Sequence, residues 1–157
     1  MVQLDEVDRA IIEQLQQDSR ATYAEIGAQV NLSAAAVHHR VKGLERRGVI
    51  TGYGARVDAA AVGLPVTAFL EIRVTNGITG DAVKADLTHI AAIEECHATA
   101  GSVDILLKVR CASPAELENL IREVRLVRGV DRTDTTVVLT TVFEDRPLAL
   151  RTRPPAG

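Results

Sequence analysis

Apolar residues near the start of the chain recur every three or four positions, which is the spacing of one face of an α-helix. They are Leu4, Val7, Ile11 and Leu15. Asp5 and Asp8 fall in the first turn of this segment, where a negative charge suits the positive end of a helix. The pattern predicts an amphipathic helix that supports the segment after it.

Two further helix signals lie between Thr22 and Tyr53. Thr22 and Glu25 form a capping box, in which each side chain satisfies a backbone N–H at the start of a helix. Asn31 tolerates the left-handed conformation that ends a helix. A short helix, a tight turn and a second helix are therefore expected here.

The second helix of this pair is predicted to expose a basic face. Ser33 is a good N-cap, and Gly48 suits the C′ position of a helix over Ala34 to Arg47. At about 100° per residue, its apolar and polar side chains fall on opposite faces. Val37, Val41 and Leu44 form the apolar face, and Ala35, His39, Lys42 and Arg46 form the other.

This order of elements is typical of a helix-turn-helix that binds duplex DNA. Small residues let a helix approach base edges, for which we expect Ala35, Ala36, His38 and His39, and basic residues further along reach phosphates. The predicted DNA contacts are Ser33, Ala35, Ala36, His38, His39, Arg40, Lys42 and Arg46. Each cation alone is more often a solvated surface charge, and it is their grouping on one face that favours DNA contacts.

The charge and composition of the whole chain limit which nucleic acids this segment is expected to bind. A net charge of -3 over 157 residues does not favour a nucleic-acid partner, but the acids gather upstream of the basic segment. Aromatic residues make up only 3%, which argues against stacking of single-stranded bases. Neither a signal peptide nor a membrane-spanning apolar run is evident, so a reduced cytoplasmic protein is expected.

The periodicity changes at Val66, where apolar and polar residues begin to alternate as in a half-buried strand. Later segments predict a helix around Val83 to Ile90, strands over 93–99 and 105–111, a capped helix from Ser113 towards Gly129, and a last strand over 131–143. The order β-α-β-β-α-β predicts a ferredoxin-like domain, with a four-stranded antiparallel sheet and both helices on one face.

The predicted fold class is therefore α+β, a winged-type helix-turn-helix domain followed by the ferredoxin-like domain. A short strand or wing is expected after Gly48. The expected boundaries are 1–58 for the DNA-binding domain, 59–65 for a linker, 66–145 for the second domain and 146–157 for a tail. Phe69 and the branched residues of the first and third strands suggest a second apolar sheet face, and hence a dimer.

Over nearly its full length the chain resembles the Lrp/AsnC (feast/famine) family. The residues in the family's register are Leu4, Asp5, Asp8, Asp18, Arg20, Leu32, Ser33, Arg40, Val41, Leu44, Glu45, Gly48, Val49, Ile50, Gly101 and Asp104. The resemblance implies a transcriptional regulator without a cofactor or metal. It also implies a homodimer that assembles further, often to an octamer, and an amino acid or related effector bound between dimers.

The resemblance also implies where the effector binds. Carried over residue by residue, the site comprises Thr99, Gly101, Ser102, Val103, Asp104, Thr133, Thr135 and Thr136. Asp104 could pair with an α-ammonium group or simply cap its turn. Relatives commonly have an acid and an aromatic where this chain has Ser102 and Val103, which implies either a different effector or a lost amino-acid response.

Two other classes of function compete with this interpretation. Sirohaem decarboxylases are similar to the family, but the chain shows no nucleophile and base constellation. A metal or redox sensor would use Glu94, Glu95, Cys96, His97 and Cys111. Adjacent strand residues point to opposite faces, so Cys96 and His97 are poorly placed to share one metal.

Overall fold

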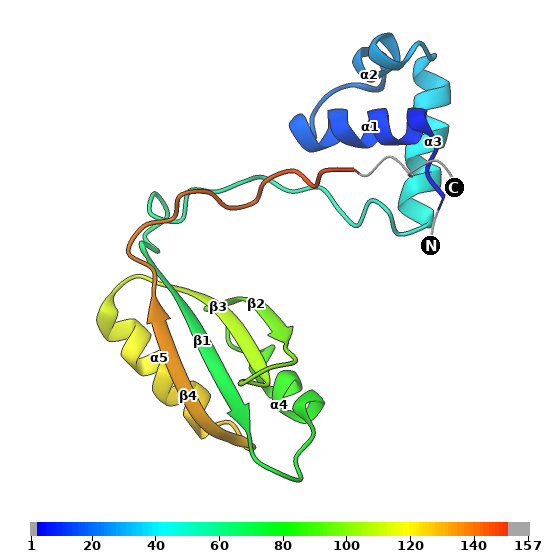
Figure 1. The fold of residues 1–157 in the computed structure, drawn as a ribbon. Helices are drawn as coiled ribbons and strands as arrows, with labels where there is room; N and C mark the ends of the chain where they lie inside the picture. The colour runs from blue at the N-terminus through cyan, green and yellow to red at the C-terminus, as the bar shows by residue number, and fades with distance from the viewer. Residues whose placement is uncertain (1–2, 151–157) are drawn as a thin grey trace. The chain divides into compact units, whose positions relative to one another are not determined.

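The computed structural model describes residues 3–150, which form two compact units (Figure 1). Residues 3–56 and 143–150 belong to the first unit, and residues 57–142 form the second. The chain therefore passes between the units twice. No helix among these residues has the length and apolar character needed to cross a membrane.

Three helices form the first unit: α1 (Glu6–Gln17), α2 (Tyr23–Val30) and α3 (Ala34–Arg46). Both hydrogen bonds of the capping box at Thr22 are present, which confirms the predicted start of α2. Asn31 is left-handed with φ 55°, as is Gly48 with φ 66°. The buried core of this unit consists of Ile11, Ile12, Ile26, Val37, Val41 and Leu44.

Gly27 is required by the packing between α2 and the turn that follows it. A Cβ atom at this position would overlap the carbonyl oxygen of Leu32. The missing side chain therefore lets the turn fold tightly against α2, which fixes where α3 begins.

The short strand expected after Gly48 does not form, because residues 49–57 contain no strand. The backbone N–H groups of Val49 and Ile50 instead donate to the carbonyl of Leu44, at 2.9 and 3.4 Å. This segment therefore closes the C-terminal end of α3.

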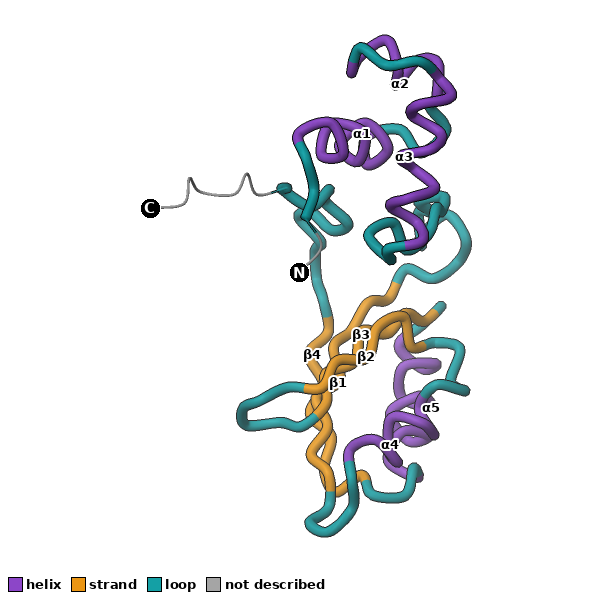
Figure 2. Tube along the Cα trace, turned by 90° about the vertical axis from the view of Figure 1, so that its right-hand side faces the viewer, coloured by secondary structure: helices purple, strands orange, loops and turns teal. Residues whose placement is uncertain are grey.

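The second unit has the predicted β-α-β-β-α-β order and an antiparallel sheet with strand order β2-β3-β1-β4. Its elements are β1 (Val66–Val74), α4 (Gly80–Leu87), β2 (Ile93–Ala98), β3 (Ile105–Cys111), α5 (Pro114–Leu126) and β4 (Val130–Val137). Both helices cover the same face of the sheet (Figure 2). The ferredoxin-like fold class is confirmed.

Strand β4 ends at Val137 and not at Phe143 as the sequence suggested. Its last pair with β1 is Ala68 with Val137, followed by one hydrogen bond from Val138 N–H to the Thr67 carbonyl at 2.9 Å. Pro65, just before β1, has no N–H to continue the ladder. Strand β4 therefore ends where the chain before β1 no longer offers a backbone N–H to pair with it.

The sheet face opposite the helices carries Phe69, as expected, but its other residues are largely polar or charged, so the expectation that the branched residues of β1 and β3 form a second apolar face is wrong. The branched residues of β1 and β3, such as Ile72 and Val109, point into the helix-covered core. On the other face Lys108 is only 8% exposed and lies 3.2 and 3.3 Å from the carboxylates of Glu94 and Glu95. Strict alternation places the polar residues of β3 on the open side.

Candidate DNA-binding and effector sites

Helix α3 is held in the first unit by one apolar stripe. Val37, Val41 and Leu44 are all 0% exposed, and the Ser33 hydroxyl caps the helix by accepting the Ala36 N–H at 3.2 Å. Because these residues fix the inward face, the opposite face of the helix remains in solvent.

The predicted base-edge residues lie at the N-terminal half of this helix. Ala35, His38 and His39 are exposed, and Ala36 is half-buried. The His38 ring lies 5.4 Å from the ring of Tyr23 at the start of α2, centroid to centroid. The exposed alanine would let this part of the helix approach a groove closely.

Lys42 and Arg46 continue the exposed face. The Lys42 ammonium lies 2.7 Å from the carboxylate of Glu45, whose hydrogen bond raises the pKa of Lys42. Arg46 donates only to the backbone carbonyl of Lys42, at 3.3 Å, and the described residues provide no carboxylate for it. Arg46 is therefore the cation on this face with most donors available to a phosphate.

Glu45 also accepts a hydrogen bond from the Tyr53 hydroxyl at 3.1 Å. Burial, together with this carboxylate, raises the pKa of Tyr53 to about 12. The phenol therefore stays neutral and ties the segment after α3 back to the helix.

Arg40, predicted to contact phosphate, points instead at α1. Its guanidinium lies 2.7 Å from the carboxylate of Asp5 and 2.8 Å from that of Asp8. Hydrogen bonds from the Asp8 N–H and from Arg40 lower the pKa of Asp5. Arg47, which the sequence interpretation missed, also reaches Asp8 at 3.2 Å. The sequence did hold a sign of these contacts, because the acid Asp8 stands at a position where the helical spacing of α1 predicts a buried residue.

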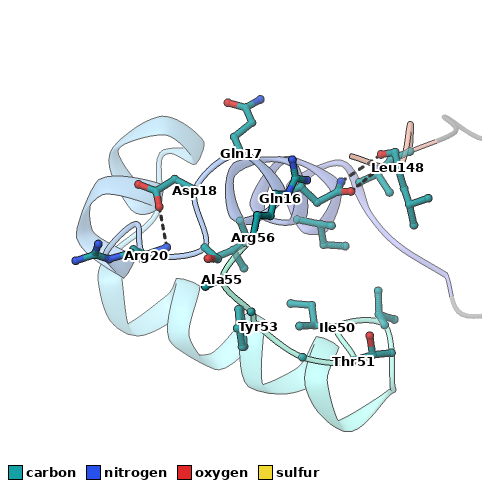
Figure 3. A pocket seen from close by; sticks show the side chains of 17 residues that line it. Gln16, Gln17, Asp18, Arg20, Ile50, Thr51, Tyr53, Ala55, Arg56 and Leu148 are labelled. Carbon is teal, nitrogen blue, oxygen red and sulfur yellow. Dashed lines mark hydrogen bonds between the residues drawn. The ribbon is translucent and has the colours of Figure 1, made fainter. Parts of the chain in front are cut away.

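A shallow groove runs along the first unit beside the C-terminal end of α1 (Figure 3). Its apolar floor includes Ile12, Leu15 and Ile50. Gln16 and Leu148 exchange two hydrogen bonds at one end, with the Leu148 N–H donating at 2.6 Å and its carbonyl accepting at 3.2 Å. The segment after β4 therefore returns to the helix-turn-helix, and Leu150 packs on its core.

The turn between β2 and β3 is the predicted effector site, and it is tied to the end of β1. Asp104 accepts the Val74 N–H on Oδ2 at 2.8 Å, and its own N–H donates to the Ile72 carbonyl at 2.9 Å. Thr99 spans the turn by donating its hydroxyl to the Val103 carbonyl at 2.6 Å. Asp104 thus caps the turn with one oxygen, and Oδ1 makes no hydrogen bond within residues 3–150.

A hollow lies next to this turn. Its lining residues are Arg73, Val74, Thr75, Asn76, Ser102, Asp104 and Asp131. Arg73 donates to the Ser102 carbonyl at 2.7 Å, which holds the guanidinium beside the turn. Gly101 is exposed, and a Cβ atom there would meet nothing within 4 Å. Acidic and basic side chains therefore border the same space, and the exposed Gly101 directly precedes Ser102 of its lining.

None of the predicted threonines of β4 lines this hollow. Thr133 pairs with Ile72, next to the turn, but it is buried and accepts a hydrogen bond from Arg125 at 2.7 Å. Thr135 shares its face, whereas Thr136 pairs with Phe69 on the opposite face. Within a single chain, the β2–β3 turn and Thr133 thus lie on either side of β1, and Thr136 lies on the opposite face of the sheet from Thr133.

The cysteines do not form a shared centre. Cys111 is buried and pairs with Val66, whereas Cys96 is exposed and pairs with Leu107. Desolvation raises the pKa of both thiols. Among residues 3–150, no three acids, histidines or cysteines are grouped to hold a metal ion.

Two family models match the chain. A model described as an AsnC-type helix-turn-helix domain covers residues 4–45, and one described as an Lrp/AsnC ligand binding domain covers residues 67–148. These ranges contain the helix-turn-helix and the sheet with its β2–β3 turn.

Individual proteins agree with these models over nearly the whole chain. The transcriptional regulator LrpA of Mycobacterium tuberculosis is 40% identical over 91% of this chain and 95% of its own length. The leucine-responsive regulatory protein of Salmonella typhimurium is 33% identical over 96% and 93%. A feast or famine regulatory protein from M. tuberculosis, solved in complex with L-methionine, superposes with a TM-score of 0.88 at 39% identity, over 93% of this chain and 99% of that one.

Proposed function

The chain belongs to the Lrp/AsnC family of transcriptional regulators, and from this premise we propose how its own residues read DNA and sense a small molecule. The family and its curated members are regulators of transcription and not enzymes. In this proposal α3 contacts duplex DNA, and an amino acid or related compound bound to the second unit alters that contact.

The exposed face of α3 is the observation that carries the DNA proposal. Small residues precede cations along this face, in the order that lets base edges be approached first and phosphates reached further on. Arg46 serves as a phosphate contact, with Lys42 beside it, and Ala35 and His39 face the bases. Arg40 is not counted among these contacts, because both neighbouring acids of α1 engage it.

The hollow at the β2–β3 turn supports an amino-acid effector. Free Oδ1 of Asp104 suits an α-ammonium group, and the guanidinium of Arg73 suits an α-carboxylate, since both line the same space. The structurally similar protein solved with L-methionine is consistent with this class of ligand. Ser102 adds no charge to this lining, whereas Asp131 adds a second carboxylate beside Arg73, so we expect a zwitterion whose side chain is not anionic.

A homodimer, assembling further to an octamer, is the proposed assembly. Phe69 and Leu106 are only half-buried on the open sheet face, and a second copy packed against this face about a two-fold axis would bury them. Such a dimer would present two α3 helices to a pseudo-palindromic DNA site. Light scattering coupled to size exclusion, with and without amino acids, measures the assembly directly.

A mobility-shift assay with the duplex upstream of the protein's own coding region tests DNA reading. We expect tighter binding to this duplex than to a scrambled duplex of equal composition at moderate salt. Equal binding to both would refute the proposal. A thermal-shift screen over all amino acids tests the effector, because a ligand that binds only the folded state raises the unfolding temperature.

A further inference from the structure

Asp8 occupies a position that α1 otherwise fills with apolar residues. It precedes Ile11 and Ile12 by three and four residues on the buried face of the helix, and it is 6% exposed. A carboxylate at such a position is destabilising unless its charge is compensated by partners. The contacts of Asp8 therefore indicate why an acid stands here.

Both oxygens of Asp8 contact arginines of the recognition helix. Oδ1 lies 2.8 Å from Arg40, and Oδ2 lies 3.2 Å from Arg47, which is seven residues and about two turns further along α3. Asp5 adds a 2.7 Å contact to Arg40 and accepts the Asp8 N–H at 2.6 Å. The start of α1 is thus joined to two levels of α3.

These contacts fix the rotation of α3 as well as its position. Six residues at about 100° each place Arg46 about 120° around the helix from Arg40. An apolar stripe alone tolerates small rotations, because its contacts are not directional. The contacts of two arginines with one buried carboxylate are directional. A rotation of α3 that turned Arg46 away from DNA would therefore break these contacts.

We infer that Asp8 is a positioning residue for DNA recognition, which holds Arg40 and Arg47 so that the exposed face of α3 points at the groove. This inference rests on the proposed function of α3. Arg40 and Arg47 then act through Asp8 and not through contacts with phosphate.

The substitution Asp8→Asn tests the inference because it keeps the shape of the side chain and removes its charge. Glu13→Gln is the matched control, since it removes the same charge from an exposed position of the same helix, where the described residues offer no ion pair. Affinity for the upstream duplex and for its scrambled counterpart is measured over a salt series, below the unfolding temperature of each variant.

We expect Asp8→Asn to lower the preference for the upstream duplex by roughly ten-fold, in the range measured for directly interacting residues. Charge alone predicts no change in this preference, because removing an acid strengthens binding to every duplex alike. Glu13→Gln is expected to show only that charge effect. An Asp8→Asn variant that behaves like Glu13→Gln would overturn the inference.

Arg40→Gln separates positioning from phosphate contact. We expect it to lower the preference without changing the salt slope, and to add little to Asp8→Asn in the double variant. A slope reduced by about 0.9 for each copy, with effects that add, would assign Arg40 to phosphate and overturn the inference. If Asp8→Asn does not fold, Arg47→Gln removes one contact from a partly exposed site, and an unchanged preference there is equally decisive.

Wild-type protein is the remaining reference. If it shows no preference for the upstream duplex, the proposed function fails and this inference falls with it. A preference that is present in the wild type and kept in all the variants overturns the positioning role alone.

Discussion

Replacing Arg46 with Ala tests the DNA-binding face in its simplest quantitative form. The guanidinium donates only to the carbonyl of Lys42, so its loss breaks no ion pair among the described residues. Each phosphate contact contributes about 0.9 to the slope of log affinity against log salt concentration. A dimer that uses both copies of Arg46 should therefore lose about 1.8 from this slope.

The magnitude follows from that slope. Over a roughly four-fold rise in salt, the wild type should lose about 12-fold more affinity than the variant, for the upstream and scrambled duplexes alike. Fluorescence anisotropy with labelled duplexes at several salt concentrations measures both slopes. The specificity ratio between the duplexes should change little, because phosphate contacts do not read sequence.

Arg122→Ala is the matched control, since Arg122 lies on α5 of the second unit and pairs with Glu118 at 3.0 Å. It removes the same formal charge from each chain. We expect its salt slope to equal that of the wild type. An Arg46→Ala slope that also equals the wild-type slope would refute the placement of Arg46 against phosphate.

Three further predictions concern packing, the effector turn and pH. Gly27→Ala should destabilise the first unit by about 1–3 kcal/mol in denaturant unfolding, because the added Cβ meets the Leu32 carbonyl. Gly43→Ala is the control and should be neutral or stabilising, because its added Cβ meets nothing within 4 Å. Equal stability of the two variants would contradict this prediction. Gly101→Ala should unfold like the wild type, since the added methyl meets nothing within 4 Å. It should lose the thermal shift given by an amino acid, because Gly101 directly precedes Ser102, which lines the hollow; a retained shift would remove Gly101 from the site. The pKa of Asp5 is lowered in the folded state, so the stabilisation that its charge gives is present above the unfolded pKa and is lost as the pH falls through the folded value. The unfolding temperature of Asp5→Asn should therefore depend less on pH in acid than that of the wild type. Parallel curves of unfolding temperature against pH for the two proteins would exclude this linkage.

Local chemistry made the helix-turn-helix predictable. The cap at Thr22, the left-handed Asn31 and the glycine after α3 act within a few residues of the chain, so their geometry can be inferred without knowing the rest of the fold. The β-α-β-β-α-β order was predictable for the same reason, because hydrophobic period and capping residues mark each element.

Features that depend on distant partners could not be predicted in this way. The end of β4 at Val137 is set by Pro65, which precedes the neighbouring strand. Arg40 looked like any basic residue of a recognition helix, and only its contacts with the acids of α1 reveal another role. The apolar face expected around Phe69 required the strand register, which shows the branched residues facing the helices.

The return of the chain from β4 to Gln16 makes the second unit an insertion within the first unit. Inside this insertion the outgoing and returning segments are paired, since Val138 donates to the Thr67 carbonyl at 2.9 Å. Domains with neighbouring termini are those most readily exchanged between host proteins. We therefore expect that another domain with adjacent ends can replace residues 67–138 and so place the proposed DNA-reading helix α3 under a different signal.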